Sequence, residues 1–313
     1  MLVPFSYNNP FWDGLQAEER CYDVAGIQLS VRQQWKPDGR GGSRLGFGAS
    51  VYDAAFVLSH FLAVLRPGLL PGRTVLDIGT GLGLSSLACA ISGAQTVVAT
   101  DGDADLLRES TLPNLQRNMQ VCPELQGWGA AAAPSLPPSP PQPAAVEGRE
   151  AGTATDSTSA SGSAVATAAA VSPAAQGGAT CTPPDRLVHV APLMWGDTEH
   201  ETALLQCLQG HAPEVIIAAD IVAAPYEDAL PLLAESLQRL MGPHTSVYIA
   251  HKPRHVCEER WFRRIGKVLD VCVLPRETSI HRDFLHGSPI RIVRLRHKAR
   301  ATQQCIETTA SQE

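Results

Sequence analysis

Several stretches of this chain arrange hydrophobic residues as β-strands do. Between residues 21 and 34, Ile27, Leu29 and Val31 recur at every second position, which predicts a strand with one buried face. Further on, short apolar runs bounded by glycine or polar residues are typical of buried strands in a parallel sheet. They predict strands at residues 74–78, 96–100, 186–190, 215–219, 246–250, 271–274 and 290–295.

Apolar residues at helical spacing fill most of the intervals between these strands. Residues 50–65 predict a largely buried helix that is capped by Ser50, with Asp53 three positions on. Further helices are predicted at residues 83–92, 105–119, 227–241 and 260–268. Strands and helices therefore alternate, which is typical of an α/β fold with a mostly parallel sheet. Two final strands without a helix between them close that sheet.

One segment differs from the rest in composition. From about Gly129 to Pro184 the chain consists almost entirely of Ala, Pro, Ser, Thr and Gly. Such a segment buries too little apolar surface to offset the entropy lost on ordering, so residues 129–184 are predicted to be a disordered insertion. It interrupts a single domain at residues 50–298, which follows an extension with β-strands at residues 1–49 and precedes a disordered tail at residues 299–313.

Charge and cysteine usage narrow the classes of protein. A net charge of −6 argues against broad binding of nucleic acid, which usually needs a basic face. No apolar window is long enough to predict a transmembrane helix, and the N-terminus lacks the pattern of a signal peptide. None of the eight cysteines forms a C-x-x-C pair. This indicates reduced thiols in the cytoplasm, with the nucleus as an open alternative.

No metal site is expected. His251 and His255 have H-x-x-x-H spacing, but Pro253 interrupts the helix that such a site needs, and the pattern offers no third ligand. Together with Lys252 and Arg254, these histidines predict a solvated basic loop or a grip on an acidic protein surface.

The densest functional signal is the glycine-rich run V-L-D-I-G-T-G-L-G-L at residues 75–84. Gly79, Gly81 and Gly83 lie between a predicted strand and a predicted helix, where they let the backbone turn tightly and approach a ligand. Asp101 ends the next strand, and a carboxylate there accepts hydrogen bonds from both hydroxyls of a ribose. Together they favour a nucleoside cofactor over a purely structural turn.

The glycine spacing bears on which cofactor binds. A dinucleotide site has the pattern G-x-G-x-x-G, whereas here Gly83 comes one position early and is followed by Leu84. Asp77, near the end of the first strand, would repel a pyrophosphate but attract a sulfonium or an ammonium group. The loop therefore fits S-adenosylmethionine better than a nicotinamide cofactor. The lack of G-x-x-x-x-G-K-[ST] excludes a P-loop.

Outside the insertion, the sequence resembles the seven-strand, S-adenosylmethionine-dependent protein-lysine methyltransferases. Within them it resembles the group that methylates valosin-containing protein, heat-shock-70 chaperones and translation elongation factors. Four blocks carry the resemblance: V-Y-D-A-A at 51–55 with Leu58, L-D-I-G-T-G-L-G-L at 76–84, T-D at 100–101 with Asn114 and Asn118, and L-M-W-G at 193–196 with A-D at 219–220. The resemblance implies a Rossmann-like, seven-stranded methyltransferase sheet with helices on both faces.

The resemblance also implies which residues hold the cofactor. The family's glycine loop and strand-end acid contact it, an aromatic residue at position 52 lines it, Trp195 packs near the adenine, and Ala219 contributes backbone. With the acid and the third glycine of the loop added, the predicted cofactor-binding residues are Tyr52, Asp77, Gly79, Thr80, Gly81, Gly83, Asp101, Trp195 and Ala219.

Two residues after the fourth strand are predicted to be catalytic. Asp220 is expected to orient the lysine amine or to accept its proton, and Tyr226 to offer an aromatic face to a methylated ammonium. The family has Tyr three residues after its Asp, whereas this chain has Ala223 there and Tyr226 just beyond. The simpler alternatives are that Asp220 only caps a loop and that Trp195 is a core aromatic.

The predicted function is methyl transfer to a lysine of a protein substrate by a monomeric chain, with neither a membrane nor a nucleic acid as partner. A methyltransferase of a small molecule or nucleic acid stays an alternative, although D-I-V-A at 220–223 is not the D/N-P-P-Y of adenine-amine enzymes. A non-catalytic methyltransferase-fold binding module is favoured by Ala223, and a nicotinamide oxidoreductase is disfavoured by Asp77 and Leu84.

Overall fold

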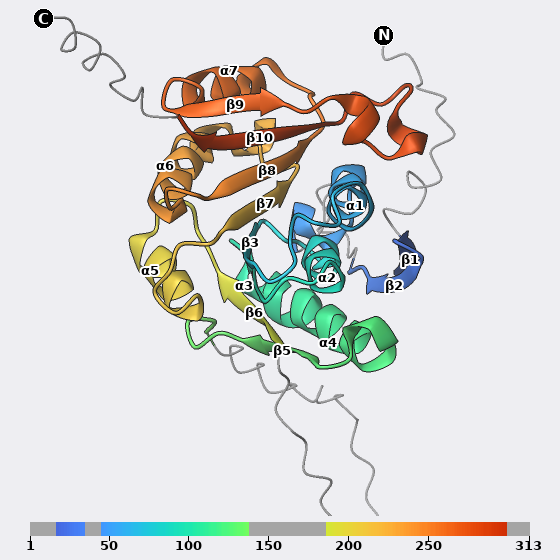
Figure 1. Cartoon of the computed structure of the whole chain (residues 1–313). Helices are drawn as coiled ribbons and strands as arrows, with labels where there is room; N and C mark the ends of the chain where they lie inside the picture. Colours follow the sequence, from blue (N-terminus) through green and yellow to red (C-terminus); the bar gives the residue numbers. More distant parts are fainter. Residues whose placement is uncertain (1–16, 35–44, 138–185, 299–313) are drawn as a thin grey trace, which may run out of the picture. The chain divides into compact units, whose positions relative to one another are not determined.

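Eight strands form the central sheet in a computed structural model of the chain, which describes residues 17–34, 45–137 and 186–298 (Figure 1). Their order is β5-β6-β4-β3-β7-β8-β10-β9. All neighbours from β5 to β8 pair in parallel, whereas β10 runs antiparallel to β8 and to β9. The strands are β3 (Thr74–Ile78), β4 (Thr96–Asp101), β5 (Trp128–Ala132), β6 (Arg186–Pro192), β7 (Val215–Ala219), β8 (Ser246–His251), β9 (Leu269–Val273) and β10 (Arg291–His297).

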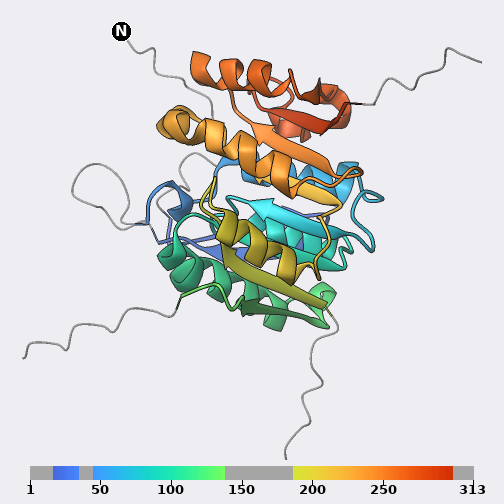
Figure 2. The ribbon, with the colours of Figure 1, turned by 90° about the vertical axis from the view of Figure 1, so that its left-hand side faces the viewer.

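Helices cover both faces of this sheet (Figures 1 and 2). On one face lie α1 (Asp53–His60), α2 (Leu84–Ile91) and α4 (Leu112–Val121), and on the other α5 (Thr198–Cys207), α6 (Leu230–Leu240) and α7 (Val256–Ile265). π-Helical turns continue α1 over η2 (Phe61–Leu65) and link α3 (Ala104–Leu106) through η3 (Leu107–Thr111) to α4. Short 3₁₀ turns are η1 (Phe47–Ala49), η4 (Pro123–Leu125), η5 (Ala224–Ala229), η6 (Arg276–Thr278) and η7 (Arg282–Phe284).

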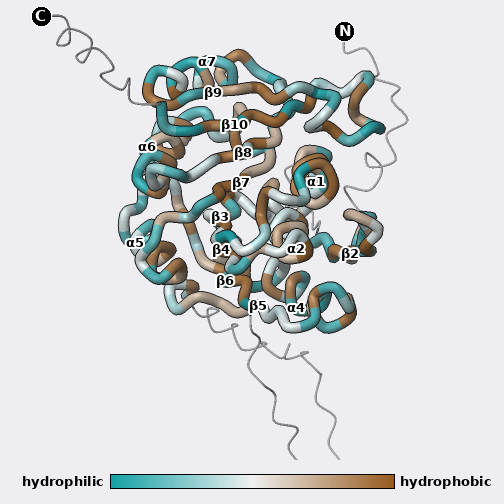
Figure 3. The backbone as a smooth tube through the Cα atoms, viewed as in Figure 1, coloured by the Kyte–Doolittle hydropathy of each residue, from teal (hydrophilic) through white to brown (hydrophobic). Residues whose placement is uncertain are grey.

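Successive side chains of the central strands lie on opposite faces of the sheet and belong to two hydrophobic cores. Val75 and Val97 belong to the core under α1, α2 and α4, while Leu76 and Val98 belong to the core under α5, α6 and α7. Because both faces are buried, these strands are largely hydrophobic, most completely in β7, whose sequence is V-I-I-A-A (Figure 3). The predicted α/β fold is confirmed, and β5 adds an edge strand to the seven that were expected.

A separate hairpin, β1 (Glu19–Val24) and β2 (Ile27–Arg32), packs against α1 and α4. The side chain of Asn118 accepts a hydrogen bond from Ser30 N (3.0 Å) and donates one to Ser30 O (2.7 Å). Asn114 likewise accepts from Arg32 N (2.9 Å) and donates to Arg32 O (3.0 Å). The two amides therefore extend the backbone hydrogen bonding of β2, as a third strand would. The strand predicted within residues 21–34 is part of this hairpin.

The described residues correct the predicted start of the insertion, and the helix predicted at residues 260–268 is α7, Val256–Ile265. The insertion was expected from residue 129, but Gly129–Ala132 pair with β6 as part of β5, and Leu136 is buried. The rest of the predicted insertion lies outside the described residues from 138 on, as do residues 1–16 and 35–44 of the predicted extension and the predicted tail. The helix α5 was not predicted.

Two local predictions were wrong. Ser50 does not cap α1, because the helix begins at Asp53 with Tyr52 at its N-cap and no side chain caps it. The helix expected to begin at Glu227 begins as the 3₁₀ turn η5 and becomes α-helical at Leu230. No described helix is both long and apolar enough to span a membrane.

Candidate functional site

A cavity of about 600 Å³ opens at the carboxyl ends of β3, β4 and β7. In the sheet, β3 has β4 as its neighbour on one side and β7 on the other, so the strand order reverses at β3. Open α/β sheets bind ligands at such a reversal. The sequence-predicted site residues among its lining are Tyr52, Gly79, Thr80, Gly81, Asp101, Trp195, Ala219, Asp220 and Tyr226. Asp77 and Gly83 are not among the lining residues.

The glycine loop needs its glycines for close backbone packing. Gly79 has φ of +69°, and a Cβ there would lie 2.6 Å from the side chain of Ile221. Gly81 has φ of +55°, and a Cβ there would lie 3.3 Å from the carbonyl oxygen of Gly48. Residues with side chains are strained in this region of φ. A Cβ at Gly79 would also collide with Ile221, and one at Gly81 would be tight against Gly48. The loop and the segment around Gly48 therefore form one wall of the cavity, made largely of backbone.

Asp77 lies beneath that wall and not in the cavity. Its side chain is fully buried, and its Oδ2 accepts hydrogen bonds from the hydroxyls of Thr80 (2.8 Å), Ser85 (2.6 Å) and Ser86 (2.7 Å). Burial raises the pKa of the Asp77 carboxyl, while the three hydroxyls oppose that shift. The residue was expected to face a cofactor, but the structure places it as the anchor that ties the glycine loop to the start of α2.

Asp101 ends β4 inside the cavity. Its Oδ2 accepts a hydrogen bond from the backbone N–H of Gly81 (3.2 Å), and its Oδ1 accepts one from Asp103 N (3.3 Å). Burial raises the pKa of this carboxyl from 3.8 to about 6, although these backbone donors lower it. The group is thus an acceptor in a poorly hydrated place, as a carboxylate that receives ribose hydroxyls should be.

Aromatic rings form another part of the cavity lining. Tyr226 of η5 meets Trp195 edge to face, with ring centroids 5.6 Å apart, and Phe47 at 6.1 Å. Burial raises the pKa of Tyr226 to about 12, with Asp101 and Tyr52 adding to the shift. Phe47 is 55% exposed, so the aromatic group extends to the surface. Tyr226 thus lines the cavity even though Ala223 occupies the position where the family has its tyrosine.

Asp220 has an ionic partner that the sequence did not predict. Arg254 donates from Nη2 to Asp220 Oδ2 at 2.8 Å and from Nη1 to Oδ1 at 3.2 Å. The backbone N–H of Lys252 also donates to Oδ1, at 3.0 Å. Asp220 itself has φ of +54°, in the left-handed region. The carboxylate is therefore fixed in orientation and neutralised by a neighbouring cation.

His251, the last residue of β8, is more buried than expected, whereas Arg254 and His255 after it are exposed. His251 was predicted to belong to a solvated basic loop, but it is 0% exposed and lies 3.6 Å from the equally buried Glu258. Burial, with Arg291 and Arg254 nearby, lowers the pKa of His251 to about 3, so the ring is neutral. Glu258 Oε2 accepts hydrogen bonds from Arg254 N (2.7 Å) and His255 N (3.2 Å). This places the Arg254 backbone beside the cavity.

Sequence reasoning missed several residues that line the cavity: Phe47, Ser85, Asp103, Met194, Arg254 and Glu258. Arg254 was noticed only as part of a basic patch. A usable signal was its position just after β8, beside the strand end that carries Asp220, since neighbouring parallel strands end at the same edge of a sheet.

The residues present fit a nucleoside cofactor that carries a positive charge. The backbone wall at Gly79 and Gly81 leaves room for a ligand, Asp101 offers acceptors, and the rings of Trp195 and Tyr226 line the same cavity. Asp101 suits a cationic ligand better than a pyrophosphate, whereas Arg254 already balances the charge of Asp220.

Comparisons with known proteins agree with this chemistry. A lysine methyltransferase family model matches residues 179–268, and a ribosomal protein L11 methyltransferase model matches residues 59–126. Protein N-lysine methyltransferase METTL21A of Danio rerio is 32% identical over 41% of this chain and 57% of its own length. EEF1A lysine methyltransferase 3 of Mus musculus is 22% identical over 80% of this chain and 72% of its own length.

Among solved structures, a ribosomal protein L11 methylase from Lactobacillus delbrueckii subsp. bulgaricus has 12% identity and a TM-score of 0.41, covering 86% of this chain and 95% of that one.

For METTL21A of Danio rerio and of Xenopus tropicalis, the chain spans 57% and 50% of the relative's length. Over the residues that match, this chain is similar to the protein-lysine methyltransferases, as its four sequence blocks predicted.

Proposed function

We propose that this chain is an S-adenosylmethionine-dependent methyltransferase that acts on a lysine side chain of a protein. The observation that carries the proposal is that one cavity holds both the predicted cofactor residues, Gly79, Gly81 and Asp101, and the predicted substrate residues, Asp220 and Tyr226. The similarity to protein-lysine methyltransferases supports the choice of lysine.

The cofactor supplies an electrophilic methyl group when it is bound. Asp101 is placed to accept hydrogen bonds from the ribose, and the glycine loop to approach the amino-acid portion with its backbone. Trp195 and Tyr52 would flank the ligand as apolar walls. These residues bind and orient, which is the main requirement for an in-line displacement.

The substrate amine must arrive without its proton, although the ordinary pKa of lysine is about 10.4. A cavity lined by Tyr226, Trp195 and Phe47 disfavours the charged form and so lowers that pKa. We assign Asp220 to orienting the amine and not to removing its proton, because Arg254 already engages both carboxylate oxygens. The proton then leaves to water.

The first experiment is methyl transfer from radiolabelled S-adenosylmethionine to proteins of a cell extract. Purified full chain would be compared with Asp101→Asn and Tyr226→Ala, and with Asp270→Asn as a matched control on the exposed edge strand β9. The proposal expects discrete labelled protein bands that Asp270→Asn keeps and the other two variants lose, with methyl-lysine identified by mass spectrometry. The cytoplasm is the compartment in which we propose to look for the substrate.

Other outcomes separate the alternatives. Label that appears only in small molecules or nucleic acid would contradict a protein substrate. Calorimetric binding of S-adenosylhomocysteine without any transfer would favour a binding module. Absence of that binding would contradict the assignment of the glycine loop and Asp101.

A further inference from the structure

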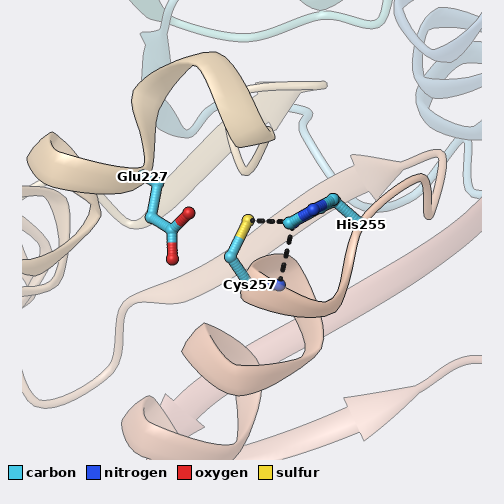
Figure 4. A group of neighbouring side chains, drawn as sticks. All are labelled: Glu227, His255 and Cys257. Carbon is cyan, nitrogen blue, oxygen red and sulfur yellow. Dashed lines mark hydrogen bonds between the residues drawn. The ribbon is translucent and has the colours of Figure 1, made fainter.

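Three metal-ligating side chains meet beside the cavity, between η5 and the start of α7. They are Glu227, His255 and Cys257, whose ligand atoms all lie within 4.8 Å of one another (Figure 4). His255 Nδ1 and Cys257 Sγ are 3.2 Å apart. Among the residues that the structure describes, this is the one group of three such side chains so arranged.

We propose that this cluster binds a divalent transition-metal ion, with Zn²⁺ as the preferred ion. A thiolate, an imidazole and a carboxylate are the donor types that zinc takes from proteins, and three of them leave a fourth position for water. Zinc-to-ligand distances of about 2.0–2.3 Å place neighbouring ligands of a tetrahedral site roughly 3–4 Å apart. The pair of His255 and Cys257 already has that spacing.

The third ligand can close the site at little cost. Glu227 lies on the other element, and its side chain is 48% exposed, so it is free to turn toward the thiol. Its Oε1 pairs with Arg260 at 3.4 Å, but an ion pair between two exposed side chains contributes little to stability.

The start of α7 also tolerates the loss of a cap from His255. The hydrogen bond from Cys257 N to His255 Nδ1 is long, at 3.4 Å. Glu258 reaches back to accept from His255 N, so the first turn keeps a second capping contact. His255 can therefore give its Nδ1 to a metal without leaving the helix uncapped.

The proposed metal site lies next to two residues that line the cavity. Glu227 directly follows Tyr226, and His255 directly follows Arg254, and both of those neighbours line the cavity. A bound ion would join η5 to the start of α7 and so hold these two lining residues at a fixed separation. Metal binding itself does not depend on the proposed methyl transfer.

The test is metal binding by the full chain after treatment with EDTA. Zn²⁺ would be titrated against a chromophoric chelator, and Co²⁺ would serve as the spectroscopic substitute. We expect one equivalent of Zn²⁺ per chain and, with Co²⁺, a thiolate-to-cobalt charge-transfer band. Glu227→Gln, His255→Ser and Cys257→Ser should each weaken Zn²⁺ binding by about tenfold or more. Cys257→Ser should also remove the band.

Matched controls make the result decisive. Cys272→Ser should bind Zn²⁺ as the parent does, because Cys272 is a described cysteine outside the cluster. Glu227→Gln alters only an exposed side chain, so its effect does not depend on folding. Failure of the parent to bind one equivalent, a band that survives Cys257→Ser, or parent-like affinity in Glu227→Gln would each overturn the proposal.

Discussion

The carboxylate of Asp220 lies in the fork of the Arg254 guanidinium, with N–O distances of 2.8 and 3.2 Å. A bidentate pair of this kind fixes the plane of the carboxylate as well as its position. Asp220 and Arg254 are thus one unit, presented to the cavity by the ends of two neighbouring strands, β7 and β8. Of the two roles expected of Asp220, this geometry favours orienting the lysine amine over accepting its proton.

The first prediction concerns Arg254. Lysine keeps the charge but cannot form the fork, so Arg254→Lys should lower kcat about tenfold or more through misorientation of Asp220. Binding of S-adenosylhomocysteine should change little. Steady-state kinetics and calorimetry would measure both, with Arg264→Lys on the exposed side of α7 as control. Parent-like turnover by Arg254→Lys would remove the positioning role.

The second prediction concerns Asp101 and pH. Its folded-state pKa is raised to about 6 from 3.8, so between those values the folded chain holds more protons than the unfolded chain. The Asp101 carboxyl therefore lowers the free energy of unfolding as the pH rises from about 4 to 6. The free energy of unfolding of Asp101→Asn, relative to the parent, should rise by about 1–2 kcal/mol between pH 4 and pH 7.5.

Urea unfolding at the two pH values tests this expectation, and calorimetry should show that the same variant loses affinity for S-adenosylhomocysteine. Asp101→Asn would thus be more stable than the parent at neutral pH but would bind the ligand more weakly. A relative stability that does not change with pH would mean that the carboxyl titrates normally.

The third prediction concerns Tyr226. Because its pKa is raised to about 12, the phenol stays protonated throughout an assay range of about pH 7–10. Tyr226→Phe should leave the shape of the pH profile of kcat/KM unchanged. Tyr226→Ala removes the ring that contacts Phe47 and Trp195 and should lower kcat/KM about tenfold or more. Tyr248→Phe, in β8, is the matched control, and a shifted profile in Tyr226→Phe would contradict the reasoning.

The fourth prediction concerns the hairpin. Asn118→Ala deprives Ser30 N–H of its acceptor and should destabilise the chain by about 1–3 kcal/mol. Gln120→Ala, on the exposed side of the same helix, should change stability by no more than about 0.5 kcal/mol. Urea unfolding measures both values, and hydrogen exchange at Ser30 should accelerate only in the first variant. Equal effects of the two substitutions would show that the amide ladder contributes nothing.

The central strands were predictable because burial on both faces leaves a continuous apolar run. The ranges 74–78 and 215–219 match β3 and β7 in full. By contrast, β5 went unnoticed because W-G-A-A-A offers no β-branched residue and merges in composition with the segment that follows. The helix α5 was missed because its sequence, TEHETALLQC, has few apolar positions at helical spacing.

Site residues that lie close together in the sequence were predictable, whereas contacts between residues far apart in the sequence were less so. Gly79, Gly81 and Asp101 lie in one β-loop-α-β unit, so their spacing along the chain indicated their grouping. Arg254 lies 34 residues from Asp220, and the two meet only because the strands before them, β7 and β8, pair in parallel. Asp77 shows the converse: its type and place favoured a ligand contact, but its Oδ2 accepts hydrogen bonds from hydroxyls three, eight and nine residues further along the chain.

The parallel pairing of β5 with β6 sets a minimum length for the low-complexity stretch between them. The chain must travel from the end of β5 at Ala132 back to the beginning of β6 at Arg186. Parallel neighbours need a return path of about a dozen residues or more, whereas a hairpin-length link can only join antiparallel strands. Variants in which this stretch is shortened to about a dozen residues should therefore still pair β5 with β6. Deleting the stretch entirely should prevent β5 from pairing with β6.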